Sequence, residues 1–174
     1  MRLLRATVQI LRLDMSLLAF LSIFVPVLVR TNDLRESVRK AAPLLFIGMC
    51  TFIINDLDDI EKDRTNHPSR PLPSGQIQPV FVAVLYFMCL AGALLTTLFC
   101  ITGEYVVFLY YLVLTLCISY SYVVEYLPAF KALYVAGASA IPVLIVIAYY
   151  PNETTLYLVA AANFSFMLGH SRPN

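Results

Sequence analysis

Long apolar runs, separated by short charged stretches, are the feature of this 174-residue sequence that most limits its possible folds. Hydrophobic residues make up 60% of the chain and charged residues 13%, against about 45–50% and about 25% in an average soluble domain. Disorder requires the opposite composition. The sequence therefore excludes a soluble globular domain and a disordered chain. It predicts an all-α, polytopic transmembrane bundle, because lipid offers no hydrogen-bond partner to an open backbone.

The apolar runs divide the chain into about six candidate spans. A helix needs about 20 apolar residues to cross hydrocarbon, with about 17 as a practical minimum. The first run follows three arginines but lacks a cleavage site, so it is interpreted as a membrane span rather than a signal peptide. The second and the last runs are short, and the second could either continue helically into the polar sequence after it or tilt in the bilayer. The predicted spans are 13–29, 41–54, 80–101, 105–124, 132–150 and 156–169.

The distribution of basic residues predicts the orientation of these spans. With a cytoplasmic N-terminus, eight of the twelve lysines and arginines fall on the cytoplasmic side, as the positive-inside rule favours. The loop at 55–79 is then cytoplasmic. The formal net charge of +1 leaves no basic surplus for nucleic acid, so no nucleic-acid partner is expected.

The loop after the second run holds the candidate chemistry. Five of the chain's acidic residues lie between positions 56 and 63. If the second helix continues, Asn55, Asp59 and Asp63 are spaced i, i+4 and i+8 and share one face, and Asp56 widens it. Such a face carries oxygen ligands over about 12 Å. A solvated loop would also be charged, but the acids are periodic and prolines stiffen the chain after them.

A stripe of carboxylates repels itself unless a cation neutralises it. Hard oxygen ligands without a nearby histidine or thiol favour Mg²⁺, which binds to one or two carboxylates and to substrate phosphates. The same loop supplies Lys62, Arg64 and Arg70, whose side chains suit the remaining phosphate oxygens. Carboxylates, Mg²⁺ and basic side chains at a membrane surface together suggest a lipid diphosphate substrate.

The acidic motif and the sequence after it resemble a motif of a known protein family. The pattern N-D-x-x-D-x-x-x-D from Asn55 to Asp63, followed by R-P-L-P-S-G from Arg70 to Gly75, resembles the first aspartate-rich motif of the UbiA superfamily of intramembrane prenyltransferases. Arg12 and Asp14 are similar to the basic–acidic pair at the start of that family's first helix. Tyr120, Ser121 and Lys131 are similar to its tyrosine–lysine stretch between the fourth and fifth helices.

The resemblance implies roles for these residues and a reaction. Mg²⁺ would bind the diphosphate of an isoprenyl donor and help it leave, and an aromatic or other lipophilic acceptor would capture the allylic cation in a water-poor cavity. Asp59 and Asp63 are the expected catalytic residues. The expected Mg²⁺ ligands are Asn55, Asp56, Asp59 and Asp63, the diphosphate-binding residues Lys62, Arg64, Arg70 and Lys131, and the acceptor-pocket residues Arg12, Asp14 and Tyr120.

One departure from the family leaves alternatives open. The family has about nine helices and a second aspartate-rich motif after the sixth, whereas no aspartate follows Asp63 here. We therefore expect residues 1–174 to form a single incomplete domain of this type, with one half of the metal site and impaired transfer. A cyclase acting on the isoprenyl diphosphate itself and a non-catalytic truncated membrane protein are the alternatives.

Overall fold

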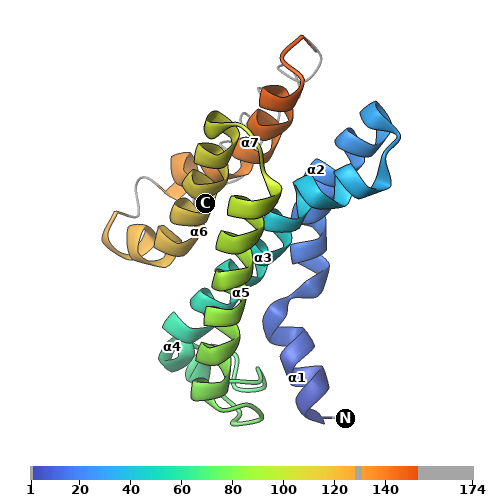
Figure 1. The fold of residues 1–174 in the computed structure, drawn as a ribbon. Helices are drawn as coiled ribbons and strands as arrows, with labels where there is room; N and C mark the ends of the chain where they lie inside the picture. Colours follow the sequence, from blue (N-terminus) through green and yellow to red (C-terminus); the bar gives the residue numbers. More distant parts are fainter. Residues whose placement is uncertain (1, 128–130, 153–174) are drawn as a thin grey trace.

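The computed structural model describes residues 2–127 and 131–152, and within these ranges every regular element is an α-helix (Figure 1). The all-α prediction is confirmed. The helices are α1 (Arg2–Leu11), α2 (Leu13–Thr31), α3 (Leu34–Asp58), α4 (Ile60–Asn66), α5 (Pro79–Cys100), α6 (Glu104–Tyr126) and α7 (Lys131–Tyr149).

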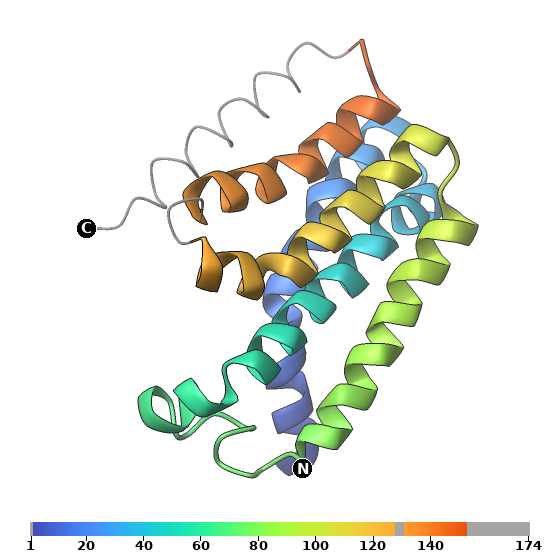
Figure 2. The same ribbon diagram turned by 90° about the vertical axis from the view of Figure 1, so that its left-hand side faces the viewer.

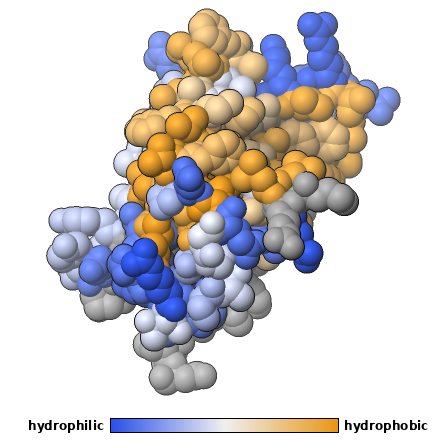
Figure 3. All heavy atoms as spheres, turned by 90° about the horizontal axis from the view of Figure 1, so that it is seen from below, coloured by the Kyte–Doolittle hydropathy of each residue, from blue (hydrophilic) through white to orange (hydrophobic). Residues whose placement is uncertain are grey.

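The five earlier predicted spans correspond to α2, α3, α5, α6 and α7, whereas the predicted span at 156–169 lies outside the described residues. Among the described residues, three helices, α2, α3 and α5, are long and apolar enough to cross a membrane. The apolar parts of α6 and α7, Glu104–Tyr120 and Leu133–Tyr149, are shorter. Outward-facing side chains are strongly apolar: Val29 is 81% exposed, Val80 74% and Phe99 77%. Figure 3 views the molecule from the end that carries α1 and α4, with hydrophilic residues in front and a broad hydrophobic surface along the helices beyond.

Helix α3 extends beyond the predicted run at 41–54 in both directions. At its start, the Asp33 side chain caps the helix by accepting a hydrogen bond from the Glu36 amide at 3.0 Å. At its end, the helix continues to Asp58, which is the first of the two alternatives for this short run. Its 25 residues span about 37 Å, longer than the roughly 30 Å of a hydrocarbon core. The acidic end of α3 therefore projects towards the membrane surface.

Helix α3 is also the centre of the bundle, since it packs against α1, α2, α5 and α6 (Figure 2). Two glycines allow close approach. A Cβ on Gly48 would lie 3.1 Å from the Ser16 Cα of α2, and a Cβ on Gly92 of α5 would lie 2.8 Å from the Phe46 ring of α3. Helix α1 buries Ala6 and Ile10 in a cluster with Cys50 and Ile53 of α3, together with Leu72, Ile77, Val82 and Cys89.

Three helices contain an internal proline: Pro26 in α2, Pro43 in α3 and Pro142 in α7. Proline has no amide hydrogen, so the carbonyl four residues earlier loses its helical donor. Membrane helices tolerate this because neighbouring groups can satisfy the released carbonyl. For Pro142 the affected carbonyl belongs to Ala138.

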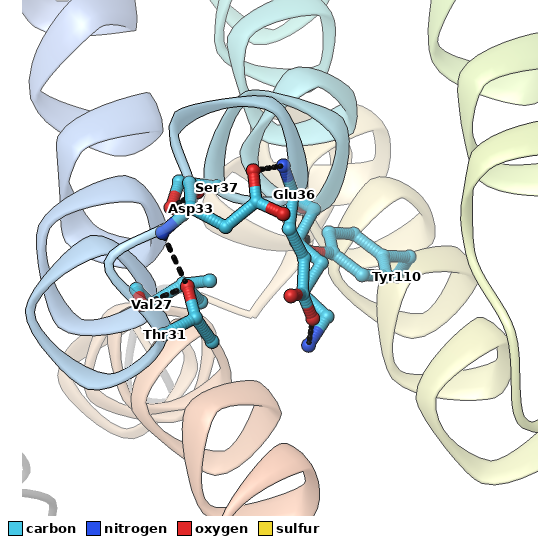
Figure 4. A network of polar contacts seen from close by, with 7 residues as sticks. Val27, Thr31, Asp33, Glu36, Ser37 and Tyr110 are labelled. Carbon is cyan, nitrogen blue, oxygen red and sulfur yellow. Dashed lines mark hydrogen bonds and ion pairs between the residues drawn. The ribbon is translucent and has the colours of Figure 1, made fainter.

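A hydrogen-bonded turn joins α2 to α3 at the end of the bundle far from α4 (Figure 4). The Thr31 hydroxyl donates to the Val27 carbonyl at 2.9 Å and accepts from the Asp33 amide at 3.2 Å. The Ser37 hydroxyl donates to the Asp33 carbonyl at 2.6 Å. Backbone groups released at the two helix ends are thereby satisfied.

Lys40 joins this turn to α6 and α7. Its ammonium group lies 2.6 Å from the Glu36 carboxylate and 4.1 Å from the centre of the Tyr149 ring. The Tyr110 hydroxyl donates to the Lys40 carbonyl. Only 12% of the Lys40 side chain is exposed, so the ion pair and the aromatic face compensate for the water it has lost.

Candidate functional site

The acidic motif is helical but bends at Asp59. Helix α3 ends there, with Asp59 at φ −91° and ψ 6°, and α4 begins at the next residue. The Asp59 amide donates to the Asn55 carbonyl at 3.0 Å, and the Asp63 amide donates to the Asp59 carbonyl at 2.8 Å. The hydrogen-bond spacing therefore continues through the bend, but α4 turns away from the axis of α3 (Figure 2). The second predicted helix, α3, thus continues to Asp58, and the bend at Asp59 is a feature that the spacing of the acids did not predict.

Arg70 joins two of the acids. Its Nη1 lies 2.6 Å from the Asp63 Oδ2 and 3.9 Å from the Asp56 Oδ1. Only 8% of the Asp63 side chain and 14% of the Asp56 side chain are exposed. Carboxylates this sheltered from water need a partner of opposite charge. The turn after α4 positions this partner, since the Arg70 amide donates to the His67 carbonyl at 3.0 Å and Gly75 adopts a positive φ of 72°.

Asp59 lies apart from this pair. Its carboxylate accepts a hydrogen bond from Lys62 at 3.2 Å, and the two side chains are 44% and 65% exposed. That hydrogen bond raises the pKa of Lys62. Arg64 similarly binds Glu61 at 2.9 Å with both side chains largely exposed. Exposed pairs of this kind contribute little to stability. The structure thus separates the acids into a sheltered pair, Asp56 and Asp63, and a less sheltered residue, Asp59.

Arg12 belongs to the acidic cluster rather than to a separate pocket. Its Nη2 lies 3.5 Å from the Asp56 Oδ1, and its guanidinium lies 5.1 Å from the centre of the Phe52 ring. Asp14, which the resemblance placed beside Arg12, is exposed on α2. Sequence separation of more than forty residues between Arg12 and Asp56 hides this contact from any local pattern.

An apolar cavity of about 440 Å³ begins next to the cluster. Asn55 and Tyr120 lie at the end nearest the acids, whereas Leu44, Val113 and Pro142 lie several helical turns further along α3, α6 and α7. The distance along α3 from Asn55 to Leu44 is about 16 Å. The other lining residues are Ala19, Ile47, Gly48, Thr51, Phe52, Leu116, Cys117, Tyr134, Val135, Ala138 and Ser139.

Tyr134 is a cavity residue that the sequence analysis did not select. Its hydroxyl lies 2.5 Å from the Ser119 hydroxyl and donates to the Leu116 carbonyl at 2.5 Å. Its ring lies 6.2 Å from that of Tyr120. Its position one helical turn after Lys131 was the sequence feature that could have indicated a place in the site. Of Lys131, the structure describes only its place as the first residue of α7.

The donor chemistry of the sheltered pair suits Mg²⁺. In the part of the chain that the structure describes, no three residues among the histidines, cysteines, aspartates and glutamates form a metal-binding group. Asp56 and Asp63 both face the Arg70 guanidinium, and Asp56 also faces that of Arg12, so the two carboxylates lie together among positive charges. Two carboxylates together with substrate phosphates are a usual set of Mg²⁺ ligands. The residues present therefore fit a metal that binds together with a diphosphate.

Comparison with known proteins identifies the family. Residues 15–172 match the model of the UbiA prenyltransferase family. The chain belongs to the UbiA prenyltransferase family. Like the other UbiA proteins, it is an integral membrane protein, as the multi-pass prediction required.

Two relatives of the chain carry the same name. The chain is 33% identical over 101 residues to digeranylgeranylglyceryl phosphate synthase from Methanoculleus marisnigri, covering 55% of this chain and 36% of the relative. It is 33% identical over 78 residues to the enzyme of that name from Methanocaldococcus jannaschii, covering 43% and 28%. The matched region thus spans about a third of each relative.

A solved structure shows the same fold. It comes from a structural and mechanistic study of digeranylgeranylglyceryl phosphate synthase in membranes, and its TM-score against this chain is 0.84 at 21% identity. The match covers 97% of this chain and 61% of the solved chain. The UbiA-type helical arrangement is therefore established for this chain.

Proposed function

We propose that this protein takes part in the transfer of an isoprenyl group from an isoprenyl diphosphate to a lipophilic acceptor, with Mg²⁺ bound at the acidic cluster. One observation carries the proposal. Asn55 lines the apolar cavity, while the next residue, Asp56, belongs to the cluster of carboxylates and guanidinium groups. An isoprenyl diphosphate has the same division into a long apolar chain and a multiply charged head.

The residues of the site would have different roles in the reaction. Asp56 and Asp63 would hold the metal, with Asp59 and Asn55 as further oxygen donors at the bend. Bound Mg²⁺ would neutralise the diphosphate and stabilise the leaving oxygen. Arg70, with the exposed Lys62 and Arg64, would bind the remaining phosphate oxygens. The allylic C–O bond then breaks with its electron pair on the diphosphate, and the acceptor nucleophile forms the new bond and loses its proton.

The cavity would protect the reactive carbon. Its mainly apolar walls offer water few hydrogen-bond partners, and water would otherwise capture the allylic cation. Phe52, Tyr120 and Tyr134 bring aromatic faces to the end nearest the acids, and such faces attract cations. Among acceptors, the names of the two relatives favour a geranylgeranylated glyceryl phosphate, with geranylgeranyl diphosphate as donor.

A transfer assay tests the proposal. The purified protein in lipid nanodiscs would receive Mg²⁺, radiolabelled geranylgeranyl diphosphate and one of three acceptors: geranylgeranylglyceryl phosphate, a hydroxybenzoate or none. We expect a labelled lipid product with the glyceryl phosphate acceptor. A cyclised hydrocarbon without acceptor would instead indicate a cyclase. No turnover under any condition would support the non-catalytic alternative.

A further inference from the structure

The backbone at Arg12 is unusual. Arg12 has φ 40° and ψ 55°, in the left-handed region, at the break between α1 and α2 (Figure 1). Among the described residues, the other non-glycine residue with positive φ is Asn32, at the opposite end of α2. Asparagine adopts this conformation comparatively readily, but a long side chain such as arginine does not. A residue held in a disfavoured conformation suggests a role that requires it.

The conformation directs the Arg12 side chain to the junction of the two parts of the site. Its guanidinium contacts Asp56 of the acidic cluster and the face of Phe52, which lines the cavity. The Arg12 amide donates to the Gln9 carbonyl at 3.3 Å, and its carbonyl accepts from the Ser16 amide at 3.0 Å. The break is therefore bonded into both helices, which fixes where the side chain begins.

We infer that Arg12 is a diphosphate-binding residue. In the protein without ligands, its guanidinium pairs with the Asp56 carboxylate instead. This inference rests on the proposed function and changes the role of Arg12 from acceptor binding to donor binding. While the site holds no metal, the guanidinium neutralises Asp56. A metal ion held at Asp56 would displace the guanidinium and leave it free to bind the diphosphate.

Two opposite effects follow for a variant without this guanidinium. The metal alone should bind more tightly, because a competing cation has left its ligand. Pyrophosphate should bind more weakly, because a charge-assisted hydrogen-bond donor is missing. If Arg12 only maintained the structure of the cluster, its loss would weaken the binding of both the metal and pyrophosphate, since a distorted cluster binds neither ligand well.

Arg12→Gly distinguishes the effect of the side chain from that of the backbone conformation. Glycine adopts the left-handed conformation freely, so the break between the helices keeps its geometry. Asn32→Gly is the matched control, because it makes the same backbone change at the far end of α2. Binding of Mn²⁺ alone would be measured by electron paramagnetic resonance, and binding of inorganic pyrophosphate in saturating Mn²⁺ by calorimetry. Thermal unfolding of each variant would accompany both.

For Arg12→Gly we expect tighter Mn²⁺ binding and about tenfold weaker pyrophosphate binding, the loss typical of one charge-assisted contact. Arg12→Lys should recover part of the pyrophosphate affinity, and Asn32→Gly should match the parent protein. Parallel weakening of both ligands would overturn the inference, as would unchanged pyrophosphate binding with a raised KM for the acceptor. If the parent protein itself binds no pyrophosphate, the proposed function fails, and the inference fails with it.

Discussion

At the scale of single residues, the acids of the motif differ in ways that their spacing does not reveal. The spacing predicts one shared face, and the residue types predict a hard-cation site. The structure places Asp63 and Asp56 against Arg70 and leaves Asp59 with Lys62. The bend at Asp59 and the long-range contact of Arg12 arise from packing between helices. That packing cannot be derived from the local sequence. The residue types of the site were therefore predictable, but which acid pairs with which basic residue was not.

Asp63 is the acid whose loss should matter most. Asp63→Asn keeps the shape of the side chain but removes its charge, and so leaves Arg70 without the carboxylate that lies 2.6 Å from it. We expect turnover to fall at least about a thousandfold, because metal stabilisation of the leaving group is worth several kcal/mol. Mn²⁺ binding should weaken in the same variant.

Asp58→Asn is the matched control for that experiment. Asp58 is exposed at the end of α3, so its variant should retain turnover and Mn²⁺ affinity within about threefold. Equal losses in the two variants would show that general charge near the membrane, rather than the sheltered pair, supports activity.

At the scale of elements, hydropathy predicted where α2, α5, α6 and α7 lie to within a few residues. It could not predict the first two turns of α3, because their charges interrupt the apolar run although Asp33 caps the helix. It also missed α1 as a separate helix, since the left-handed turn at Arg12 has no sequence signal such as glycine. Side-chain capping and tertiary contacts determined these boundaries.

The contact between α3 and α5 gives a test of packing. Gly92→Ala would place a methyl group 2.8 Å from the Phe46 ring, so we expect destabilisation of about 1–3 kcal/mol. Gly137→Ala in α7 is the control, because a Cβ there meets nothing within 4 Å and alanine favours a helix. Thermal unfolding in one detergent would compare them. A stable Gly92→Ala protein would contradict the described α3–α5 contact.

The far end of the cavity should limit the donor. Leu44 lies about 16 Å along α3 from Asn55, so it would meet the tail of a long isoprenyl chain. Leu44→Ala is expected to raise the relative rate with longer donors, and Ala138→Phe to favour geranyl over geranylgeranyl diphosphate. Competition assays with mixed donors would measure the ratio. Val29→Ala, on the exposed surface, is the control, and a ratio that stays constant in both cavity variants would exclude this role.

At the scale of the whole molecule, the position in the bilayer remains a prediction from charge. The acidic end of the bundle, with α4 and the turn at Ser74, should face the cytoplasm. Single cysteines at Ser74 and Asn152, both exposed, in a background without the four native cysteines would test this. An impermeant maleimide should label position 152 from outside and position 74 only after permeabilisation. The reverse pattern would invert the topology.

In the proposed reaction, the proline in α7 would affect the lifetime of the allylic cation. Pro142 and Ala138 both line the cavity, and the Ala138 carbonyl has lost its helical donor. A carbonyl oxygen carries partial negative charge, and in surroundings of low polarity that charge acts over a longer range than in water. Unlike a carboxylate, it is too weak a nucleophile to trap the electron-poor carbon. The Ala138 carbonyl would thus attract the positive charge of the cation without forming a bond to its carbon, which stays free to react with the acceptor.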